Sequence, residues 1–90
     1  MKIIVNRIGV EIRLKQEISL DPPSPELRDV VRALRDRMGD QLERFVGADC
    51  SLIDYSVLLV NGRNMLSLDG WATEIHAGDE LTFVVPVAGG

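Results

Sequence analysis

The stretch that decides the fold is Leu81-Thr82-Phe83-Val84-Val85-Pro86-Val87-Ala88-Gly89-Gly90, at the C-terminal end of the sequence. Its first half is an apolar run with the length and composition of a buried strand. Its second half begins with a proline, which cannot donate a hydrogen bond to a sheet, and finishes on two glycines. A terminal Gly-Gly presents only backbone and a carboxylate, so it fits channels too narrow for other residues. Our hypothesis is a strand that leads into a slender tail whose working group is the Gly90 carboxylate. The alternative, which the Gly-Gly pair alone favours, is an idle chain end, because most chain termini are disordered.

Size and composition indicate one folded domain over residues 1–90, with residues 86–90 as its tail. A chain of this length buries roughly 60–70% of its extended surface, and the hydrophobic fraction of 46% argues against disorder. The net charge is -4 and the basic residues are interleaved with acidic ones, so no basic stripe exists for a nucleic acid. Neither a signal peptide nor an apolar run of the ~20 residues of a membrane helix is found. We expect a cytoplasmic protein that binds neither nucleic acid nor membranes.

The N-terminal part of the chain predicts two strands. Residues 2–8 are rich in β-branched side chains and form the first. Apolar and charged residues alternate over residues 10–15, and apolar residues return at 18 and 20. This pattern indicates a half-buried second strand, or a short turn that leads into a strand at residues 17–20; the register of the hairpin stays open. Asp21-Pro22-Pro23 ends this region.

A helix follows. Ser24 is the expected N-cap and Pro25 the expected first helical residue, because a proline loses nothing there. The apolar residues that follow have helical spacing: Leu27, Val30, Val31, Leu34 and Met38. Gly39 is the expected stop, and residues 42–46 predict a further helical turn that closes the core.

The second half of the chain predicts three more strands. Residues 56–60 read as a buried central strand, residues 63–68 as a short edge strand, and residues 80–85 as the last strand. Asn61-Gly62 predicts a tight turn, because both residues tolerate positive φ, and turns are also expected at 69–70 and 77–79, with Ile75 as an apolar anchor. One helix on one face of a mixed sheet is an α+β arrangement.

The side chains offer no conventional active site. His76 stands without a second histidine or cysteine near it, which predicts a loop histidine and no metal site. Cys50, the single cysteine, follows Asp49 and has no histidine partner, so it is expected to be inert. The glycines sit at separate turns and form no phosphate loop. These absences favour a carrier that other proteins act on, and not an enzyme.

Several short motifs together resemble one family. They are Val60-Asn61-Gly62, Leu68-Asp69, Gly78-Asp79-Glu80-Leu81, the helical stretch Leu27 to Leu34, and Pro86-Val87-Ala88-Gly89-Gly90 at the end. In this order and spacing they resemble the MoaD/ThiS sulfur-carrier family of small ubiquitin-like proteins. The resemblance covers most of the chain and implies the β-grasp, ubiquitin-like fold, with the last strand inserted at the centre of the sheet.

Within that family the sequence is closer to the small subunit of molybdopterin synthase, MoaD. The ending Val87-Ala88-Gly89-Gly90 and the stretch Asn61-Gly62-Arg63-Asn64 are similar to that branch. Val85 stands where that branch often has a proline, and Trp71-Ala72-Thr73 is similar to the thiazole-synthesis branch. A carrier for thiazole or cysteine synthesis therefore stays open as an alternative.

The resemblance implies a mechanism. An E1-type, MoeB-like enzyme would use ATP to adenylate the Gly90 carboxylate, and a persulfide or sulfide would displace AMP to leave a thiocarboxylate on Gly90. A MoaE-like large synthase subunit would receive the tail in a heterotetramer, where the sulfur is donated to a pterin precursor of the molybdenum or tungsten cofactor. No permanently bound cofactor and no metal are expected. Gly89 would keep the tail slender and Pro86 would limit its flexibility, which lowers the entropy lost on insertion.

The globular part needs a surface for these partners. Alternation along the last strand places Leu81, Phe83 and Val85 on one side and Thr82 and Val84 on the other. We expect the bulkier set to face the helix, which leaves Leu59 and Val84 as apolar contacts for partners. The alternative is that both residues belong to the core, because short buried strands are apolar on both sides.

Two other classes of function remain open from the sequence. A ubiquitin-like modifier would need the same tail and the same adenylation, but would join Gly90 to a lysine amine of a target protein. An interaction domain with this fold would not use its tail at all. A thiocarboxylate on Gly90 would distinguish the carrier, and an isopeptide bond the modifier.

Overall fold

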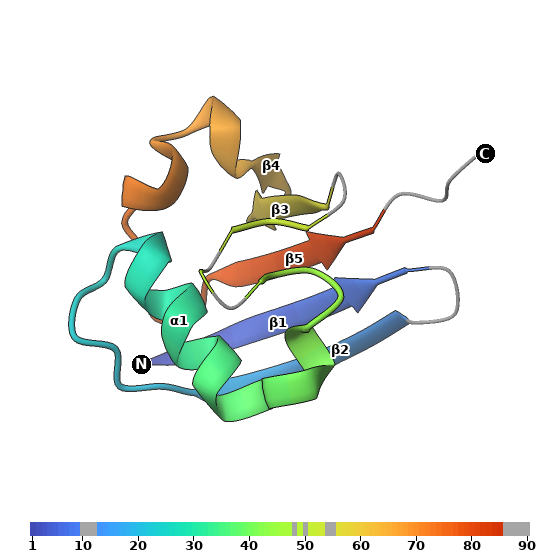
Figure 1. Cartoon of the computed structure of the whole chain (residues 1–90). Helices are drawn as coiled ribbons and strands as arrows, with labels where there is room; N and C mark the ends of the chain where they lie inside the picture. The colour runs from blue at the N-terminus through green and yellow to red at the C-terminus, as the bar shows by residue number, and fades with distance from the viewer. Residues whose placement is uncertain (10–12, 48, 50, 54–55, 86–90) are drawn as a thin grey trace.

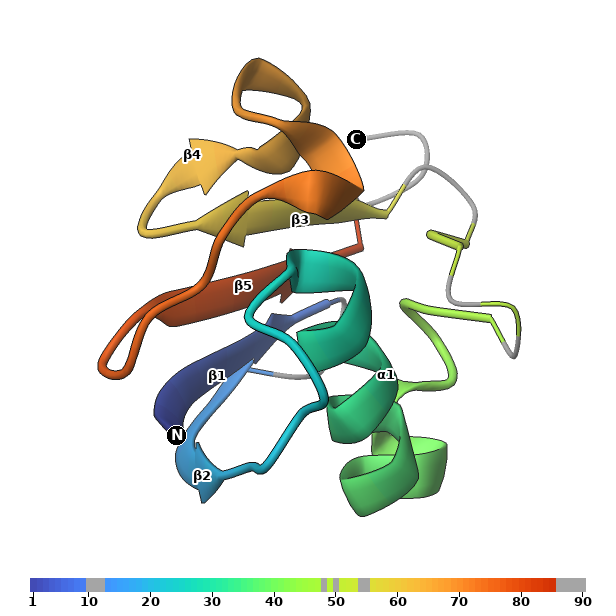
Figure 2. The ribbon, with the colours of Figure 1, turned by 90° about the vertical axis from the view of Figure 1, so that its left-hand side faces the viewer.

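The chain folds into a five-stranded mixed sheet with one α-helix packed on one face (Figures 1 and 2). This computed structural model describes residues 1–9, 13–47, 49, 51–53 and 56–85. The elements in chain order are β1 (Lys2–Ile8), β2 (Arg13–Ser19), α1 (Leu27–Met38), η1 (Gly39–Leu42), β3 (Val57–Val60), β4 (Arg63–Asn64), η2 (Met65–Ser67), η3 (Gly70–Ala72) and β5 (Glu80–Val84).

The last strand lies in the middle of the sheet. The strand order is β2-β1-β5-β3-β4, and β5 pairs parallel with β1 and antiparallel with β3. This is the ubiquitin-like β-grasp, so the predicted α+β class, the order of elements and the central insertion of the last strand are confirmed. The prediction that residues 56–60 form the central strand is wrong. β3 lies between β5 and the short edge strand β4, and its residues alternate between half-buried and buried because only one face of the sheet is covered.

The first hairpin has a defined register. β1 and β2 pair antiparallel from Lys2 opposite Ser19 to Ile8 opposite Arg13. The second strand is therefore confirmed, but within it only Ile18 is buried. Leu14 is 52% exposed, and the residue opposite it is the buried Arg7. The positions of Val10 and Ile12 lie outside the described residues.

The helix starts later than predicted. α1 begins at Leu27, and its N-cap is Glu26, which is extended (φ -64, ψ 141) and makes no capping hydrogen bond with its side chain. Ser24 is not the N-cap: its hydroxyl accepts from the Glu26 N–H (3.3 Å) and donates to the Asp29 carboxylate.

The delay has a tertiary cause. The Leu27 N–H donates to the Thr73 carbonyl (2.7 Å), and the Pro25 carbonyl accepts from the Ile75 N–H (2.8 Å). Glu26 thus forms an isolated β-bridge with Glu74, which holds the chain extended through Pro25. The predicted stop is confirmed, because α1 ends at Met38 and Gly39 has φ 55, a conformation that favours glycine.

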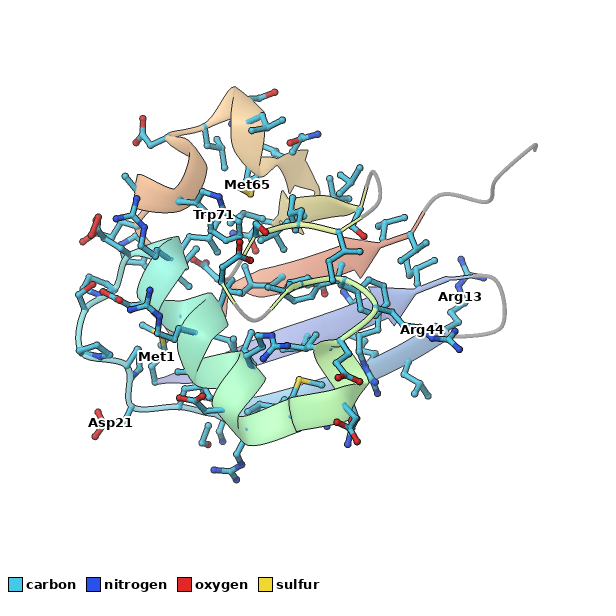
Figure 3. All side chains as sticks on the ribbon, viewed as in Figure 1. Met1, Arg13, Asp21, Arg44, Met65 and Trp71 are labelled. Carbon is cyan, nitrogen blue, oxygen red and sulfur yellow. The ribbon has the colours of Figure 1, made fainter. Side chains whose placement is uncertain are left out.

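The core lies between α1 and the sheet. The five residues of the predicted helical stripe are all buried, as are Leu81 and Phe83 of β5 and the anchor Ile75. The predicted turn after the helix is η1, followed by Phe45 and Val46, which are also buried. Met65 is buried and Trp71 is half-buried against the same core, and both turn inward from segment 65–72 (Figure 3).

Arg7 is the one charged residue in the described core face of β1. It is 6% exposed, and its guanidinium donates to the Gln41 carbonyl (3.1 Å) and to Gln16 Oε1 (3.3 Å). These bonds tie η1 to the first hairpin. The apolar pattern of residues 2–8 gave no indication of this role.

The predicted edge strand 63–68 is shorter than expected. β4 covers Arg63–Asn64, after which the chain turns into η2. The Asn64 side-chain oxygen accepts from the Leu66 N–H (2.9 Å), and this bond starts a helical turn in place of a continued ladder.

The core predicts that truncation of two different leucines to alanine has very different effects on stability. Leu34 is fully buried at the centre of α1, whereas Leu66 in η2 is 76% exposed. We expect Leu34→Ala to lower the free energy of unfolding by about 2–5 kcal/mol, because it leaves a cavity. The matched variant Leu66→Ala should change it by less than about 0.5 kcal/mol. Urea denaturation of both variants measures the difference, and equal effects would contradict this core.

Candidate functional site: the outer face of the sheet and the base of the tail

The predicted working residues, Pro86, Val87, Ala88, Gly89 and Gly90, lie outside the described residues. The structure describes the residue from which they start. The Val85 N–H donates to the Ile8 carbonyl (2.9 Å), and the Val85 side chain packs against the core. The tail therefore starts from a residue that is fixed to the end of β1. The prediction that Val85 shares the helix-facing side with Leu81 and Phe83 is confirmed.

The face of the sheet opposite α1 carries an apolar group that we call the docking face. It consists of Ile4, Ile8, Val57, Leu59 and Val84, all half-buried and none part of the buried core. Strand register places them together: Val84 lies opposite both Ile8 and Val57, and Leu59 lies opposite Thr82. Among the described elements, the helix lies on the other side of the sheet (Figure 2). Leu59 and Val84 thus lie on one helix-free face and are not core residues, while their role as partner contacts stays a prediction.

Sequence reasoning found two members of the docking face and missed three. Ile4, Ile8 and Val57 became recognisable only through the strand pairing, because each is an ordinary strand residue in the sequence. The available signal was the alternation of strand residues between the two faces of the sheet. Ile3 and Val5 are buried, so the even-numbered residues of β1 had to face the other side.

Polar groups divide and border the docking face. Asn6 Nδ2 donates to Thr82 Oγ1 (3.0 Å) in the middle of the face, and Thr82 is 6% exposed. Toward β2, Lys2 pairs with Glu17 (3.4 Å) and Lys15 pairs with Glu80 (3.6 Å). Exposed pairs of this kind add little to stability. They do place charges of both signs beside the apolar group, where they favour partners of matching charge.

The docking face adjoins Val85, the residue from which the tail starts. Val84 belongs to the face, and the next residue, Val85, is bonded to Ile8, another member of the face. A protein that covers this face therefore lies beside the point from which the tail starts.

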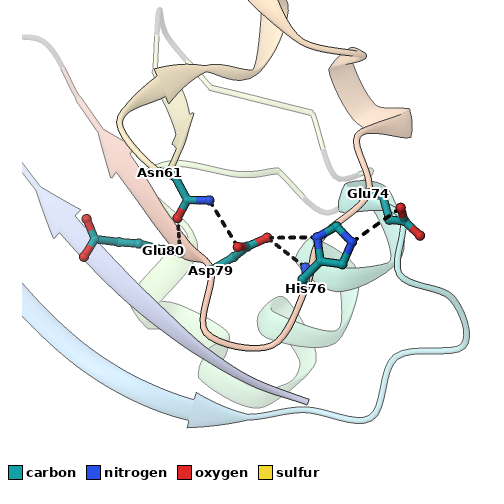
Figure 4. Close-up of polar contacts among 5 residues, drawn as sticks. All are labelled: Asn61, Glu74, His76, Asp79 and Glu80. Atoms are coloured by element: carbon teal, nitrogen blue, oxygen red, sulfur yellow. Dashed lines mark hydrogen bonds and ion pairs between the residues drawn. The ribbon is translucent and has the colours of Figure 1, made fainter.

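At the other end of β5, two turns are braced against each other (Figure 4). Asn61 has φ 51, and its backbone N–H donates to the Glu80 carbonyl (2.8 Å). The Asn61 side chain accepts from the Glu80 N–H (2.9 Å) and donates to Asp79 Oδ1 (3.1 Å). The motifs around Asn61-Gly62 and Gly78-Asp79 are thus one structural unit, which fixes the β3–β5 register on which the docking face depends.

His76 belongs to the same unit. Its backbone N–H donates to Asp79 Oδ2 (2.8 Å), and its ring nitrogens lie 3.7 Å from Asp79 Oδ2 and 3.5 Å from Glu74 Oε2 (Figure 4). The ring is 68% exposed, so it lies at the surface of a turn, as predicted for a loop histidine. Its neighbours are two carboxylates, with no nucleophile among them.

The described residues hold no group of three or more His, Cys, Asp or Glu side chains arranged for a metal ion. Cys50 lies outside the described residues. Beside it in sequence, Asp49 has a pKa below its ordinary value, because the Ser51 hydroxyl (2.6 Å) and the Ser51 N–H (3.1 Å) donate to its carboxylate. These bonds close a local turn. None of the helices in the described part of the chain has the length and apolarity needed to span a membrane.

Comparison with known proteins agrees with this geometry. The ThiS family profile matches residues 3–90. A protein of Archaeoglobus fulgidus, named as a candidate sulfur carrier, is 30% identical in an alignment over 88 residues that covers 92% of this chain and 100% of that protein. Among solved structures, small archaeal modifier protein 1 of Haloferax volcanii matches with a TM-score of 0.72 at 23% identity over 100% of both chains. The protein of that name from Methanosarcina acetivorans matches with a TM-score of 0.63 at 22% identity, over 99% of this chain and 96% of that one.

The fold and the tail-bearing strand thus define a ubiquitin-like β-grasp protein. The ThiS family profile matches nearly the whole chain, so this protein belongs to the ThiS family. The resemblance to the MoaD/ThiS family is confirmed. The relative from Archaeoglobus fulgidus is named as a candidate carrier, in agreement with the expected carrier role.

The braced turns predict a measurable loss of stability. Asp79→Ala removes the acceptor of both the Asn61 amide and the His76 N–H, so we expect the free energy of unfolding to fall by about 1–2 kcal/mol. Asp69→Ala is the control, because Asp69 is exposed and its side chain makes no capping hydrogen bond. Urea titrations measure the free energy of unfolding of both variants. An Asp79→Ala protein as stable as the control would contradict a stabilising role of these hydrogen bonds.

Proposed function

We propose that this protein is a sulfur carrier whose Gly90 carboxylate is converted to a thiocarboxylate. The observation that carries the proposal is the ThiS family match, which runs through the Gly89-Gly90 ending. The relative from Archaeoglobus fulgidus, named as a candidate carrier, supports it over nearly the same length. The docking face beside the base of the tail is the surface that such a protein needs for handling by larger enzymes.

The chemistry requires an activating enzyme of the E1 type. A carboxylate is a poor electrophile, so one Gly90 oxygen first attacks the α-phosphate of ATP, pyrophosphate leaves, and an acyl adenylate forms. Sulfide then attacks the carbonyl carbon, the bond to AMP breaks, and Gly90 carries a thiocarboxylate. If a persulfide attacks, a thiol must also reduce the resulting acyl disulfide. This protein supplies no catalytic side chain and provides the tail and the docking face.

Within this chemistry we propose that the acceptor pathway is that of the molybdenum or tungsten cofactor. The protein would then be the small subunit of molybdopterin synthase and would insert its tail into a MoaE-like large subunit, in a heterotetramer. The residues that favour this branch are Val87 to Gly90 and Asn61 to Asn64, which are similar to the MoaD pattern. Gly89 and Gly90 suit a narrow channel because they have no side chains.

A second function uses the same first step. The likeness in fold to small archaeal modifier proteins favours a role as a protein modifier, with the adenylated Gly90 joined to a lysine amine of a target. The two functions differ in the product on Gly90. Intact mass of the protein, isolated gently from its source cells, tests both: one oxygen-to-sulfur exchange mapped to Gly90 supports the carrier, and an isopeptide linkage supports the modifier.

A reconstituted reaction makes a negative result informative. The purified protein is incubated with ATP, its activating enzyme and sulfide, and the Gly90 peptide is then measured by mass spectrometry. Thiocarboxylate at Gly90 is the expected product. Absence of both thiocarboxylate and acyl adenylate would overturn the carrier and the modifier together.

Two tail variants test the role of the last residues. Deletion of Gly90 should abolish thiocarboxylate formation, because the carboxylate then lies one residue short of the reacting position. Gly89→Val should block activation or insertion through its added bulk. Neither change touches the described core, so the circular dichroism spectrum and the unfolding midpoint should stay as in the wild type, and Ser67→Ala on the exposed surface of η2 is the control for activity.

The docking face predicts a loss of binding without a loss of fold. Leu59→Asp and Val84→Asp each place a charge inside the apolar group, so we expect at least about a tenfold weaker complex with the activating enzyme. Leu66→Asp is the matched control, since Leu66 is apolar and more exposed but lies outside the face. Isothermal titration calorimetry measures the three affinities; equal weakening by Leu66→Asp would show that this face has no special role.

A further inference from the structure

We propose that this protein self-associates through the free edge of β2, by forming a continuous antiparallel sheet with a second copy of itself. The proposal goes beyond the sulfur-carrier function and does not depend on it. β2 is a terminal strand of the sheet, and among the described residues it pairs only with β1. At seven residues it is much longer than β4, the two-residue strand at the opposite edge.

The register of the hairpin shows which backbone groups lie at this edge. Met1 and Leu20 exchange two hydrogen bonds (2.8 and 2.7 Å). In an antiparallel ladder such pairs recur at every second residue, so Ile18, Gln16 and Leu14 also direct their N–H and C=O groups toward β1. The alternate residues, Arg13, Lys15, Glu17 and Ser19, direct theirs outward. The free edge therefore presents four donors and four acceptors.

The side chains of the same alternate residues are self-complementary. In a two-fold arrangement, Lys15 of one copy faces Glu17 of the other, and Glu17 faces Lys15, so opposite charges meet twice. Arg13 and Ser19 face each other in the same register. A shift by two residues in one direction sets Glu17 against Glu17. The same shift in the other direction sets Lys15 against Lys15, although it also sets Arg13 against Glu17 twice. Among the three registers, only the proposed one places no like charges of β2 opposite each other.

The same register gives a partner to the one exposed apolar residue of β2. Leu14 lies on the helix side of the sheet and is 52% exposed. In the two-fold arrangement it faces Ile18 of the second copy, and Gln16 faces Gln16 at the symmetry axis. On the helix side, an open hollow of about 310 Å³ runs along this edge. It is lined by Gln16, Glu17, Ile18 and Ser19 from β2 and by Arg37, Met38 and Gln41. The hollow leaves room beside the strand for the incoming side chains.

The arrangement leaves the proposed carrier surfaces free. Arg13 lies at one end of β2, and Asp21 lies beyond its other end (Figure 3). The docking face is built from β1, β5 and β3, so β2 separates its apolar residues from the symmetry axis. Each copy would keep its own tail base at Val85.

Charge reversal tests the proposal. We expect sedimentation equilibrium to show a monomer–dimer equilibrium for the full chain within concentrations up to about 1 mM. Lys15→Glu alone and Glu17→Lys alone each place like charges opposite each other at two positions of the dimer. Each should therefore weaken association at least about tenfold. The double variant Lys15→Glu/Glu17→Lys restores both pairs of opposite charges and should restore the dimer. It also loses the pairs with Glu80 and Lys2 within one chain, so those pairs cannot explain a recovery.

Hydrogen exchange gives a second readout. The amides of Arg13, Lys15, Glu17 and Ser19 should become protected as concentration rises, whereas those of Leu14, Gln16 and Ile18 should be protected at every concentration. A protein that stays monomeric up to about 1 mM would overturn the proposal. So would a dimer whose strength is unchanged by both single reversals, because association then uses another surface. Unfolding midpoints of all variants show that each remains folded.

Discussion

The pairing of β5 between β1 and β3 is the constraint on which the rest of this structure depends. It joins the two ends of the chain in one sheet, since β1 is the first strand and β5 the last. It buries Leu81 and Phe83 against α1 and places Val84 on the opposite face. It also carries the chain out at Val85, where the N–H bonds to Ile8. Core, docking face and base of the tail all follow from the position of this one strand.

That strand is held at both ends by specific hydrogen bonds. At its start, the Asn61 side chain bridges the Glu80 N–H and the Asp79 carboxylate, and at its end Val85 continues the pairing with β1. A register shift by one residue would exchange the two faces of β5 and expose Phe83. The braced turns therefore protect the docking face indirectly. This gives the Asn-Gly and Gly-Asp motifs a structural role at the end of β5 opposite to the tail.

In the proposed carrier function, the globular part would offer larger enzymes a constant surface, and the slender tail would deliver one reactive group into a closed site. The docking face and the base of the tail share Ile8 and the adjacent Val84 and Val85, so a partner bound on the face would lie beside the residue from which the tail starts. The charged residues of β2 border this surface and present a separate, self-complementary edge.

Local signals in the sequence determined much of this protein. The apolar spacing from Leu27 to Met38 determined the helix, Gly39 its end, and Asn61-Gly62 the tight turn, because each depends on neighbouring residues alone. The family was also readable from the sequence, whereas the chemistry of the tail stays a proposal. The start of α1 was not, because the bridge between Glu26 and Glu74 delays it. The sequence also did not show that Arg7 is buried or that β3 is half-buried. It did not show that Ile4, Ile8 and Val57 lie on one face with Leu59 and Val84. These features depend on strands far apart in the sequence that lie side by side only in the folded sheet, so only the tertiary structure decided them.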